Sequence, residues 1–95
     1  MEEEQEAQQE KKEEKVGKIT HYFGKIGVGV VEVEKGTLKV GDTVHIKGGT
    51  TDFEQTVDSL QVEHEDVEEV KEGDAAGMKV AEKVREGDVV YKVVA

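Results

Sequence analysis

The stretch that decides the fold is SLQVEHEDVEEVKEGDAAGMKV, which occupies residues 59–80. Leu60 and Val62 alternate with polar neighbours, and this period of two is typical of a strand with one buried face. The dipeptide Gly73-Asp74 favours a turn, because glycine accepts positive φ and aspartate can bond its own backbone. Small residues follow at 75–77, where another backbone can approach closely. The stretch therefore predicts a strand, a short acidic connection, a turn and a second strand.

The Gly-Asp turn occurs twice more in the chain, at residues 41–42 and 87–88. Each copy leads into a valine-rich run, at 43–47 and at 89–94. Repeated turns that feed short apolar runs are typical of small all-β domains. The spacing predicts a small all-β barrel, and this pattern alone indicates no function.

Length and composition place the chain among small single-domain proteins. Its 95 residues suit one domain. It contains no cysteine, so neither a disulfide nor a thiolate zinc site is expected. No apolar run approaches the roughly 20 residues that a membrane helix needs. The N-terminus lacks a basic-then-apolar signal pattern, so we expect a cytoplasmic protein without membrane contact.

The charge is strongly negative, with a formal net charge of -10. Residues 1–15 carry seven Glu and three Lys, a net -4, which leaves -6 for the remainder. A negative body argues against general nucleic-acid binding, which depends on Lys and Arg displacing counterions. Residues 1–15 also hold too little apolar surface to fold. They are predicted to form an acidic tail, disordered or a frayed helix, before a β domain at residues 16–95.

In two predicted strands the alternation of apolar and polar residues shifts by one position. In residues 28–34, valines occupy both parities, which predicts a bulge assisted by the neighbouring glycines. In residues 53–63, the shift falls between Val57 and Leu60. The last run, 89–94, also has valines on both faces, which favours contact with a partner at one end of the domain.

Histidine is a common metal ligand, so we examined the spacing of His21, His45 and His64 for a metal site. No pair has ligand spacing such as i,i+2 on one strand or i,i+4 on a helix. The carboxylates around residues 63–69 lack the alternating ligands and central glycine of a calcium loop. No metal and no cofactor are predicted.

The Gly-rich loop at residues 48–52 holds Thr50, Thr51 and Asp52, with His45 just before it. A hydroxyl, a carboxylate and an imidazole can form a nucleophilic set. No pattern supplies an orienting third group or an oxyanion site, and Thr and Asp in such loops usually bond their own turn. We therefore assign no catalytic residue and keep an enzymatic loop as the weakest alternative.

Several motifs carry a family resemblance. GKIGV at residues 24–28 and EKGTLKVGD at 34–42 resemble the opening of the second domain of translational GTPases such as elongation factor Tu. SLQVEHEDVEEV at 59–70 is similar to a strand and connection of that domain, and GDAAG and REGDVV complete the order. The resemblance implies a six-stranded closed antiparallel Greek-key β-barrel. More narrowly, the chain resembles small translation elongation factor-like proteins, and similar barrels occur as accessory domains of collagenase-like peptidases.

The resemblance also implies a binding pocket. In the elongation factors this domain helps hold the aminoacyl end of tRNA, and the matching positions here are Thr20, Tyr22, Val30, Gln61 and Ala75. The family often has Asn at the position of Ala75 and an acidic residue at that of Gly17, so polar groups that would grip an amino acid are missing. The 95 residues contain no P-loop pattern, and GTP hydrolysis by this chain alone is not expected.

Two functional hypotheses follow. The leading one is a non-catalytic barrel that binds a translation component (ribosome, tRNA or factor), through the pocket side around Tyr22, Gln61 and His64 with the 48–52 loop beside it. The alternative is an accessory subunit or domain of a separately encoded collagenase-like peptidase or RNA-modifying enzyme. Direct RNA contact and the oligomeric state stay open.

Overall fold

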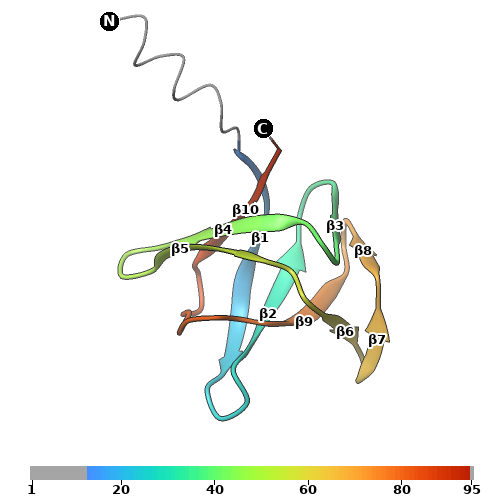
Figure 1. Ribbon diagram of the computed structural model, residues 1–95, viewed down its shortest axis with the longest axis horizontal. Coiled ribbons are helices and arrows are strands. Elements are labelled where there is room, and N and C mark those ends of the chain that lie inside the picture. Colours follow the sequence, from blue (N-terminus) through green and yellow to red (C-terminus); the bar gives the residue numbers. More distant parts are fainter. Residues whose placement is uncertain (1–12, 95) are drawn as a thin grey trace, which may run out of the picture.

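The computed structural model describes residues 13–94, which form strands and no helix (Figure 1). The strands are β1 (Glu13–Phe23), β2 (Val28–Val33), β3 (Thr37–Lys39), β4 (Thr43–Lys47), β5 (Asp52–Thr56), β6 (Leu60–Val62), β7 (Glu65–Val67), β8 (Glu69–Lys71), β9 (Ala75–Lys79) and β10 (Val89–Val93). The predicted all-β class is confirmed. Within this range no helix is available to cross a membrane.

Eight strands form one antiparallel sheet, in the order β5-β4-β10-β1-β2-β9-β6-β7. β3 and β8 pair separately as a two-stranded sheet. The large sheet curls around a core of aliphatic side chains, so the fold is barrel-like (Figure 1). The fully buried side chains include Ile19, Leu38, Ile46, Leu60 and Met78.

The prediction of a closed six-stranded barrel is not met within residues 13–94, because no ladder joins the β5 end of the sheet to the β7 end. The predicted long strand at 53–63 instead divides into β5 and β6. At the break, the Val57 amide donates to the Asp42 carbonyl (2.8 Å), and its carbonyl accepts from the Gly41 amide (2.8 Å). These bonds tie the backbone of Val57 to the β3–β4 turn, so it is not available to a continuous ladder.

A side chain closes the gap that the ladder leaves. The Gln55 amide donates to the Lys79 carbonyl at 2.8 Å, and its oxygen accepts from the Ala81 amide at 2.7 Å. Gln55 lies on β5 and Lys79 ends β9, so one side chain satisfies both a backbone acceptor and a backbone donor across the opening. The continuous chain from β5 to β6 and this bridge replace the missing ladder.

The valine pattern of β2 has a different cause from the one predicted. β2 alternates regularly, with Gly29, Val31 and Val33 buried and the residues between them half-buried. The irregularities lie in β1, where the register shifts between Lys15 and Gly17 and again between Ile19 and His21. The expected bulge in residues 28–34 was therefore wrong, and the outward valines of β2 need another explanation.

All three Gly-Asp turns share one geometry. Gly41, Gly73 and Gly87 have φ values of 101°, 91° and 94°, the left-handed region that glycine tolerates best. In each turn the following aspartate carboxylate accepts from the amide three residues earlier, with Lys39, Lys71 and Arg85 as donors. Glycine at the third position of a four-residue turn and an aspartate that bonds its own backbone explain why this dipeptide recurs.

The domain begins earlier than predicted. β1 starts at Glu13, and Glu13, Glu14 and Lys15 pair with Val93, Lys92 and Tyr91 of β10. Residues 13–15 therefore belong to the sheet and not to the acidic tail, because β10 offers them a ladder that the polar sequence does not reveal. The rest of the predicted tail lies outside the described residues.

Candidate partner-binding groove

An open groove of about 350 Å³ lies on the outer face of the sheet, where β2, β9 and β6 run side by side. Its lining is mostly apolar: Phe23, Ile26, Val28, Val30, Gln61, Glu63, His64, Ala75, Ala76 and Gly77. Val30 is paired with Gly77, and Gly77 with Gln61, so these three residues form one row across the strands. Because Gly77 has no side chain, the floor of the groove is low at the centre of that row.

The groove explains the valines at both parities of β2. Val31 and Val33 point into the core, whereas Val28 and Val30 face outward and line the groove. A strand exposed on one face would ordinarily carry polar residues there. Apolar residues on both faces of β2 therefore mark a second surface that is suited to burial.

Two large apolar side chains stand at one end of the groove. Phe23 is 46% exposed and Ile26 is 63% exposed, and both belong to the β1–β2 hairpin. The Phe23 ring contacts His21, with ring centroids 4.3 Å apart. Exposed aromatic and aliphatic side chains beside an apolar groove are typical of a surface that binds another molecule.

The other end of the groove is a strained turn. Glu63 and His64 connect β6 to β7 and have φ values of 53° and 69°. A two-residue hairpin with both residues at positive φ strongly favours Asn-Gly or a similar pair. Glu-His is costly at this place, and such strain persists chiefly where the side chains have a use.

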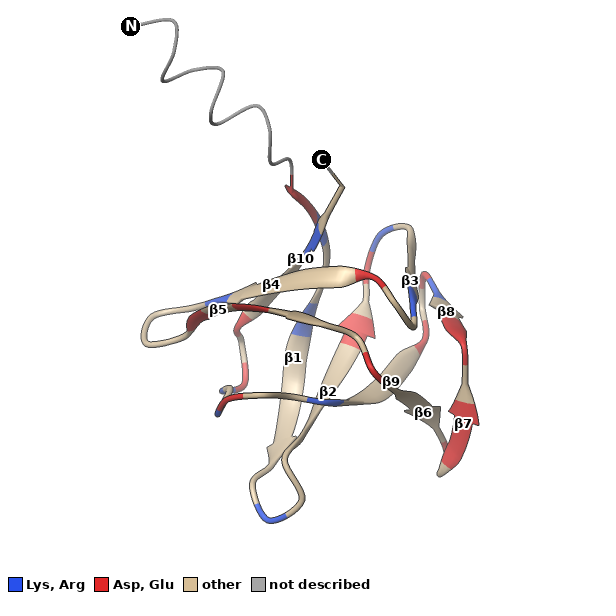
Figure 2. Cartoon of the chain, viewed as in Figure 1, with Lys and Arg blue, Asp and Glu red and all other residues tan. Residues whose placement is uncertain are grey.

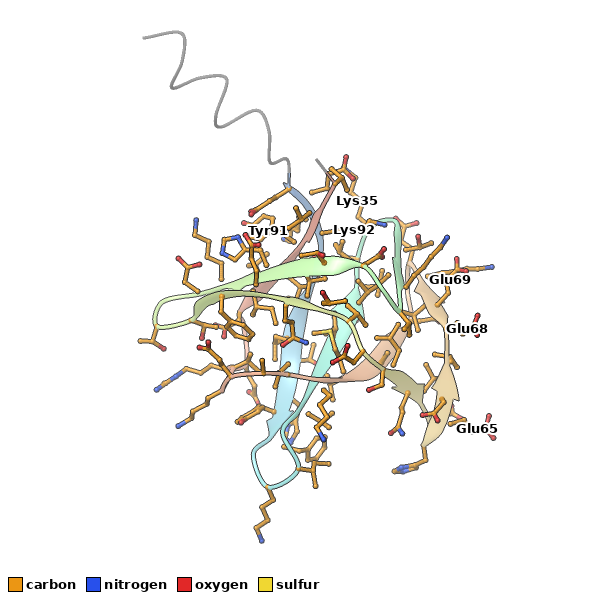
Figure 3. The ribbon with its side chains drawn as sticks, viewed as in Figure 1. Lys35, Glu65, Glu68, Glu69, Tyr91 and Lys92 are labelled. Atoms are coloured by element: carbon orange, nitrogen blue, oxygen red, sulfur yellow. The ribbon has the colours of Figure 1, made fainter. Side chains whose placement is uncertain are left out.

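Acidic side chains flank the groove on its β6–β7 side. Figure 2 shows acidic residues along β7 and β8, and Figure 3 shows Glu65, Glu68 and Glu69 projecting outward from this edge. A phosphate backbone would be repelled here. A protein segment with apolar side chains and neighbouring Lys or Arg would match both the groove and its flank.

Three lysines near the start of β1 contact acceptors of the chain itself. Lys15 and Lys18 both contact the Glu34 carboxylate, at 3.5 and 3.6 Å. Lys92 lies 3.7 Å from Asp42 and donates to the Thr37 carbonyl at 3.1 Å. These pairings favour a structural role over phosphate binding.

The structure brings four of the six predicted partner-binding residues together. Val30, Gln61, His64 and Ala75 all line the groove. Thr20 lies beside them, with its hydroxyl 3.5 Å from the Val30 carbonyl. Tyr22 does not join them: it packs against the core, because the bulge between Ile19 and His21 reverses which face the following residues occupy. Their binding role remains a prediction.

The loop at residues 48–52 lies away from the groove. In Figure 1 the β4–β5 connection is on the left and β6 and β7 are on the right. Thr51 is 5% exposed, its carbonyl accepts from the Gly48 amide at 2.7 Å, and Thr50 is exposed. The buried Thr51 gives no support to the enzymatic alternative, and the loop was wrongly placed beside the pocket.

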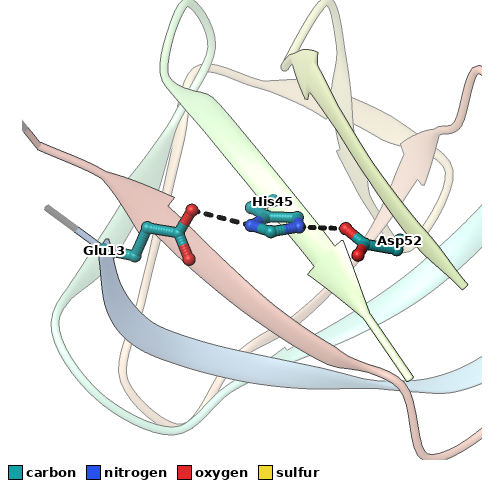
Figure 4. Close-up of polar contacts among 3 residues, drawn as sticks. All are labelled: Glu13, His45 and Asp52. Carbon is teal, nitrogen blue, oxygen red and sulfur yellow. Dashed lines mark hydrogen bonds and ion pairs between the residues drawn. The ribbon is translucent and has the colours of Figure 1, made fainter. Parts of the chain in front are cut away.

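A second polar arrangement centres on His45, which is only 14% exposed at its side chain. Its Nδ1 lies 2.7 Å from Glu13 Oε2, and its Nε2 is hydrogen-bonded to Asp52 Oδ1 (Figure 4). Hydrogen bonding to Asp52, and secondarily to Glu13, raises the pKa of His45 above its ordinary value despite partial burial. The same bond to His45 holds the pKa of Asp52 below its ordinary value.

Sequence reasoning missed this cluster, except for the proximity of His45 to Asp52. Glu13 is far away in the chain and was assigned to the tail. Glu54 pairs directly with His45 in the β4–β5 ladder, and Tyr91 of β10 pairs with it on the other side. Glu13, His45 and Glu54 each offer one potential metal-ligand atom, and these three atoms lie within 4.8 Å of one another. The register of the strands brings these residues together, and no local sequence pattern predicts that register.

Comparison with known proteins identifies the class. The family model of elongation factor Tu domain 2 matches residues 27–91, and the chain belongs to that family. The predicted resemblance to translational GTPase barrels is thereby confirmed.

Two of the sequence relatives are named as a protease and a collagenase. The chain is 42% identical over 77 residues to an uncharacterized protease of Methanocaldococcus jannaschii, covering 80% of this chain and 19% of the protease. It is 38% identical over 78 residues to a collagenase of Porphyromonas gingivalis, covering 81% of this chain and 22% of the collagenase. The chain thus spans about a fifth of the length of the curated relatives that it matches.

Solved structures show the same fold. The C-terminal domain of a Geobacillus thermoleovorans protein assigned to the U32 peptidases superposes with a TM-score of 0.77 at 18% identity, covering 83% of this chain and 91% of that chain. GDP-bound aIF5B from Aeropyrum pernix gives a TM-score of 0.58 at 18% identity, covering 96% of this chain and 17% of that one. At these identities the likeness concerns the fold alone.

Proposed function

We propose that this chain is a non-catalytic accessory barrel for a collagenase-like peptidase of the U32 type, either as a subunit or as a domain. The observation that carries the proposal is the identity of 42% and 38% with two peptidases over about four-fifths of this chain. The likeness to translation factors concerns the domain family and the fold. Its sequence relatives therefore favour the peptidase alternative over a translation partner.

The groove is the surface that we assign to docking. Its apolar lining and the exposed Phe23 and Ile26 would be covered by apolar side chains of the catalytic part of the peptidase. Its acidic flank would face basic residues of the same partner (Figure 2). Burial of an aromatic anchor in a groove supplies much of the affinity in such interfaces, and the charges mainly set orientation and association rate.

The test is a binding measurement with a defined partner. The 95-residue chain is mixed with the purified catalytic part of a collagenase-like peptidase from the same organism, and binding is followed by calorimetry and size-exclusion chromatography. We expect a 1:1 complex. The double variant Phe23→Ser/Ile26→Ser should weaken it at least about tenfold, since loss of buried anchors costs about 1.4 kcal/mol or more.

Val40→Ser is the matched control, because Val40 is 42% exposed, close to the 46% of Phe23, and does not line the groove. It should leave the affinity unchanged. Absence of a complex with the wild-type chain would refute the accessory role. Equal weakening by Val40→Ser would refute the groove as the docking surface while leaving the role itself intact.

A translation partner is the second candidate, favoured by the elongation factor Tu domain 2 match. Sedimentation with ribosomes in about 50 and 300 mM salt distinguishes the two candidates, because this range spans weak and strong screening of charged contacts. Stable sedimentation with ribosomes, together with no binding to the peptidase, would replace the first proposal by the second.

A further inference from the structure

The His45 cluster lies on three strands and holds the donor set of a metal centre. We propose that Glu13, His45 and Glu54 bind one Zn²⁺ ion, with Asp52 positioning the imidazole. The site is separate from the groove, which is lined by β2, β6 and β9 and the adjoining hairpins. This inference does not depend on the accessory role.

The ligand types fit zinc. One imidazole nitrogen and two carboxylate oxygens form a three-ligand set that zinc accepts, with a fourth position left for water or for a group from a partner. Oxygen-only cages suit calcium and magnesium, whereas imidazole suits zinc and its transition-metal neighbours. The presence of His45 at the centre of the carboxylates therefore selects zinc over the hard cations.

The three ligand atoms lie near the spacing of zinc ligands but have not yet reached it. Each ligand atom lies about 2.1 Å from a zinc ion, so two ligand atoms on one ion are at most about 4.2 Å apart. The three donor atoms of this set already lie within 4.8 Å of one another. Both glutamates have long side chains, and Glu54 is exposed on β5, so rotation of these side chains would have to close the remaining distance.

The two nitrogens of His45 have different roles in this site. Nδ1 faces Glu13 and is the metal ligand, whereas Nε2–H donates to Asp52. A histidine that binds a metal almost always donates its other N–H to a carboxylate or carbonyl, which fixes the ring and raises its basicity. Asp52 already occupies this position, so the carboxylate that orients the His45 ring is in place (Figure 4).

The ion would replace a proton. His45 is held by two carboxylates, which favours the imidazolium, and zinc binding releases the Nδ1 proton to the buffer. The bound ion would join the beginning of β1 to β4 and β5 across β10, where Tyr91 lies opposite His45 with ring centroids 6.4 Å apart. The expected consequence is a sheet stabilised at the end where β1 begins.

The experiment is a titration of the full 95-residue chain with Zn²⁺ against a chromophoric chelator, repeated with Co²⁺ to record the visible spectrum. We expect one saturable site whose affinity falls as the pH falls, because protons compete for His45. His45→Gln should abolish it, and Glu54→Gln should weaken it strongly. Asp52→Asn should lower the affinity about 10- to 100-fold, the usual effect of losing the carboxylate that orients a ligand.

His21→Gln and His64→Gln are the matched controls, because both histidines lie outside the cluster and should bind zinc as the wild type does. Circular dichroism checks each variant for folding, and Glu54→Gln decides the question if His45→Gln fails to fold. Zinc binding that persists in both variants would show adventitious binding by other acidic residues and overturn the proposal. No saturable binding by the wild type, or equal loss in the two controls, would also overturn it.

Discussion

The groove and the His45 cluster are both on the outside of one curled sheet, yet they are built in opposite ways. The groove is apolar, open and formed by residues of adjacent strands around the glycine floor at Gly77. The cluster is polar and formed by residues from β1, β4 and β5, with β10 between two of them. The apolar surface suits a macromolecular partner, whereas the charges that converge on one imidazole suit a small ion.

The largest effect should come from Gly17 of β1, the strand that contributes Phe23 to the groove and Glu13 to the cluster. A Cβ on Gly17 would lie 2.0 Å from the Glu32 carbonyl oxygen, a backbone atom that cannot rotate away. Gly17→Ala should therefore lower the free energy of unfolding by about 3 kcal/mol, as overpacking against a fixed neighbour does. Urea denaturation measures it, and both sites should weaken together because β1 contributes to each.

Gly73→Ala is the control for Gly17→Ala. A Cβ there would meet nothing within 4 Å, so only the φ of 91° is unfavourable, and the cost should be about 1 kcal/mol. Equal losses for the two variants would show that the close approach of β1 to β2 does not decide stability.

The next effect separates the two regions. Phe23→Ser/Ile26→Ser should weaken peptidase binding at least about tenfold and leave zinc affinity unchanged, while His45→Gln should do the reverse. Residues without shared partners usually contribute independently. Calorimetry on the double and combined variants measures both affinities. Loss of peptidase binding in His45→Gln would join the two regions into one site and contradict the comparison.

A smaller effect concerns pH. The folded pKa of His45 is raised, so the stability it contributes is fully present below about pH 6.5 and is lost as the pH rises through its folded pKa. The folded pKa of Asp52 is lowered, so its contribution is present above about pH 3.9 and is lost as the pH falls through its folded value. The stability difference between wild type and His45→Gln should be largest between these limits.

Urea midpoints of the two proteins, measured in a chelator at about pH 5.5, 7 and 8.5, test this sign. The chelator removes any bound metal, and Glu13, Asp52, Glu54 and Lys47 are the charged groups around the ring. Asp52→Asn should reduce the pH dependence. A difference that grows from pH 5.5 to 8.5 would show that the imidazolium is not the stabilising form.

The two regions also differ in how far the sequence predicted them. The family motifs pointed to the groove, and four of the residues predicted from sequence meet there, whereas the valines at both parities in 28–34 were wrongly interpreted as a bulge. The cluster depends on the register of β10 against β1 and β4, which no local pattern encodes. The all-β class followed from the three Gly-Asp turns, whereas the open ladder depends on where the backbone of Val57 finds its hydrogen bonds.

The smallest effect tests whether the strained β6–β7 turn is retained because its side chains contact the partner. Glu63→Asn/His64→Gly places the preferred pair at the β6–β7 turn, where both residues have positive φ, and should raise the free energy of unfolding by about 1 kcal/mol. Urea denaturation measures the gain, and calorimetry with the peptidase measures the cost. More stability with weaker binding would show that Glu63 and His64 are retained for contact, as expected of strained residues at a working surface. A gain in stability with unchanged binding would confine the docking surface to Phe23, Ile26 and the strand floor.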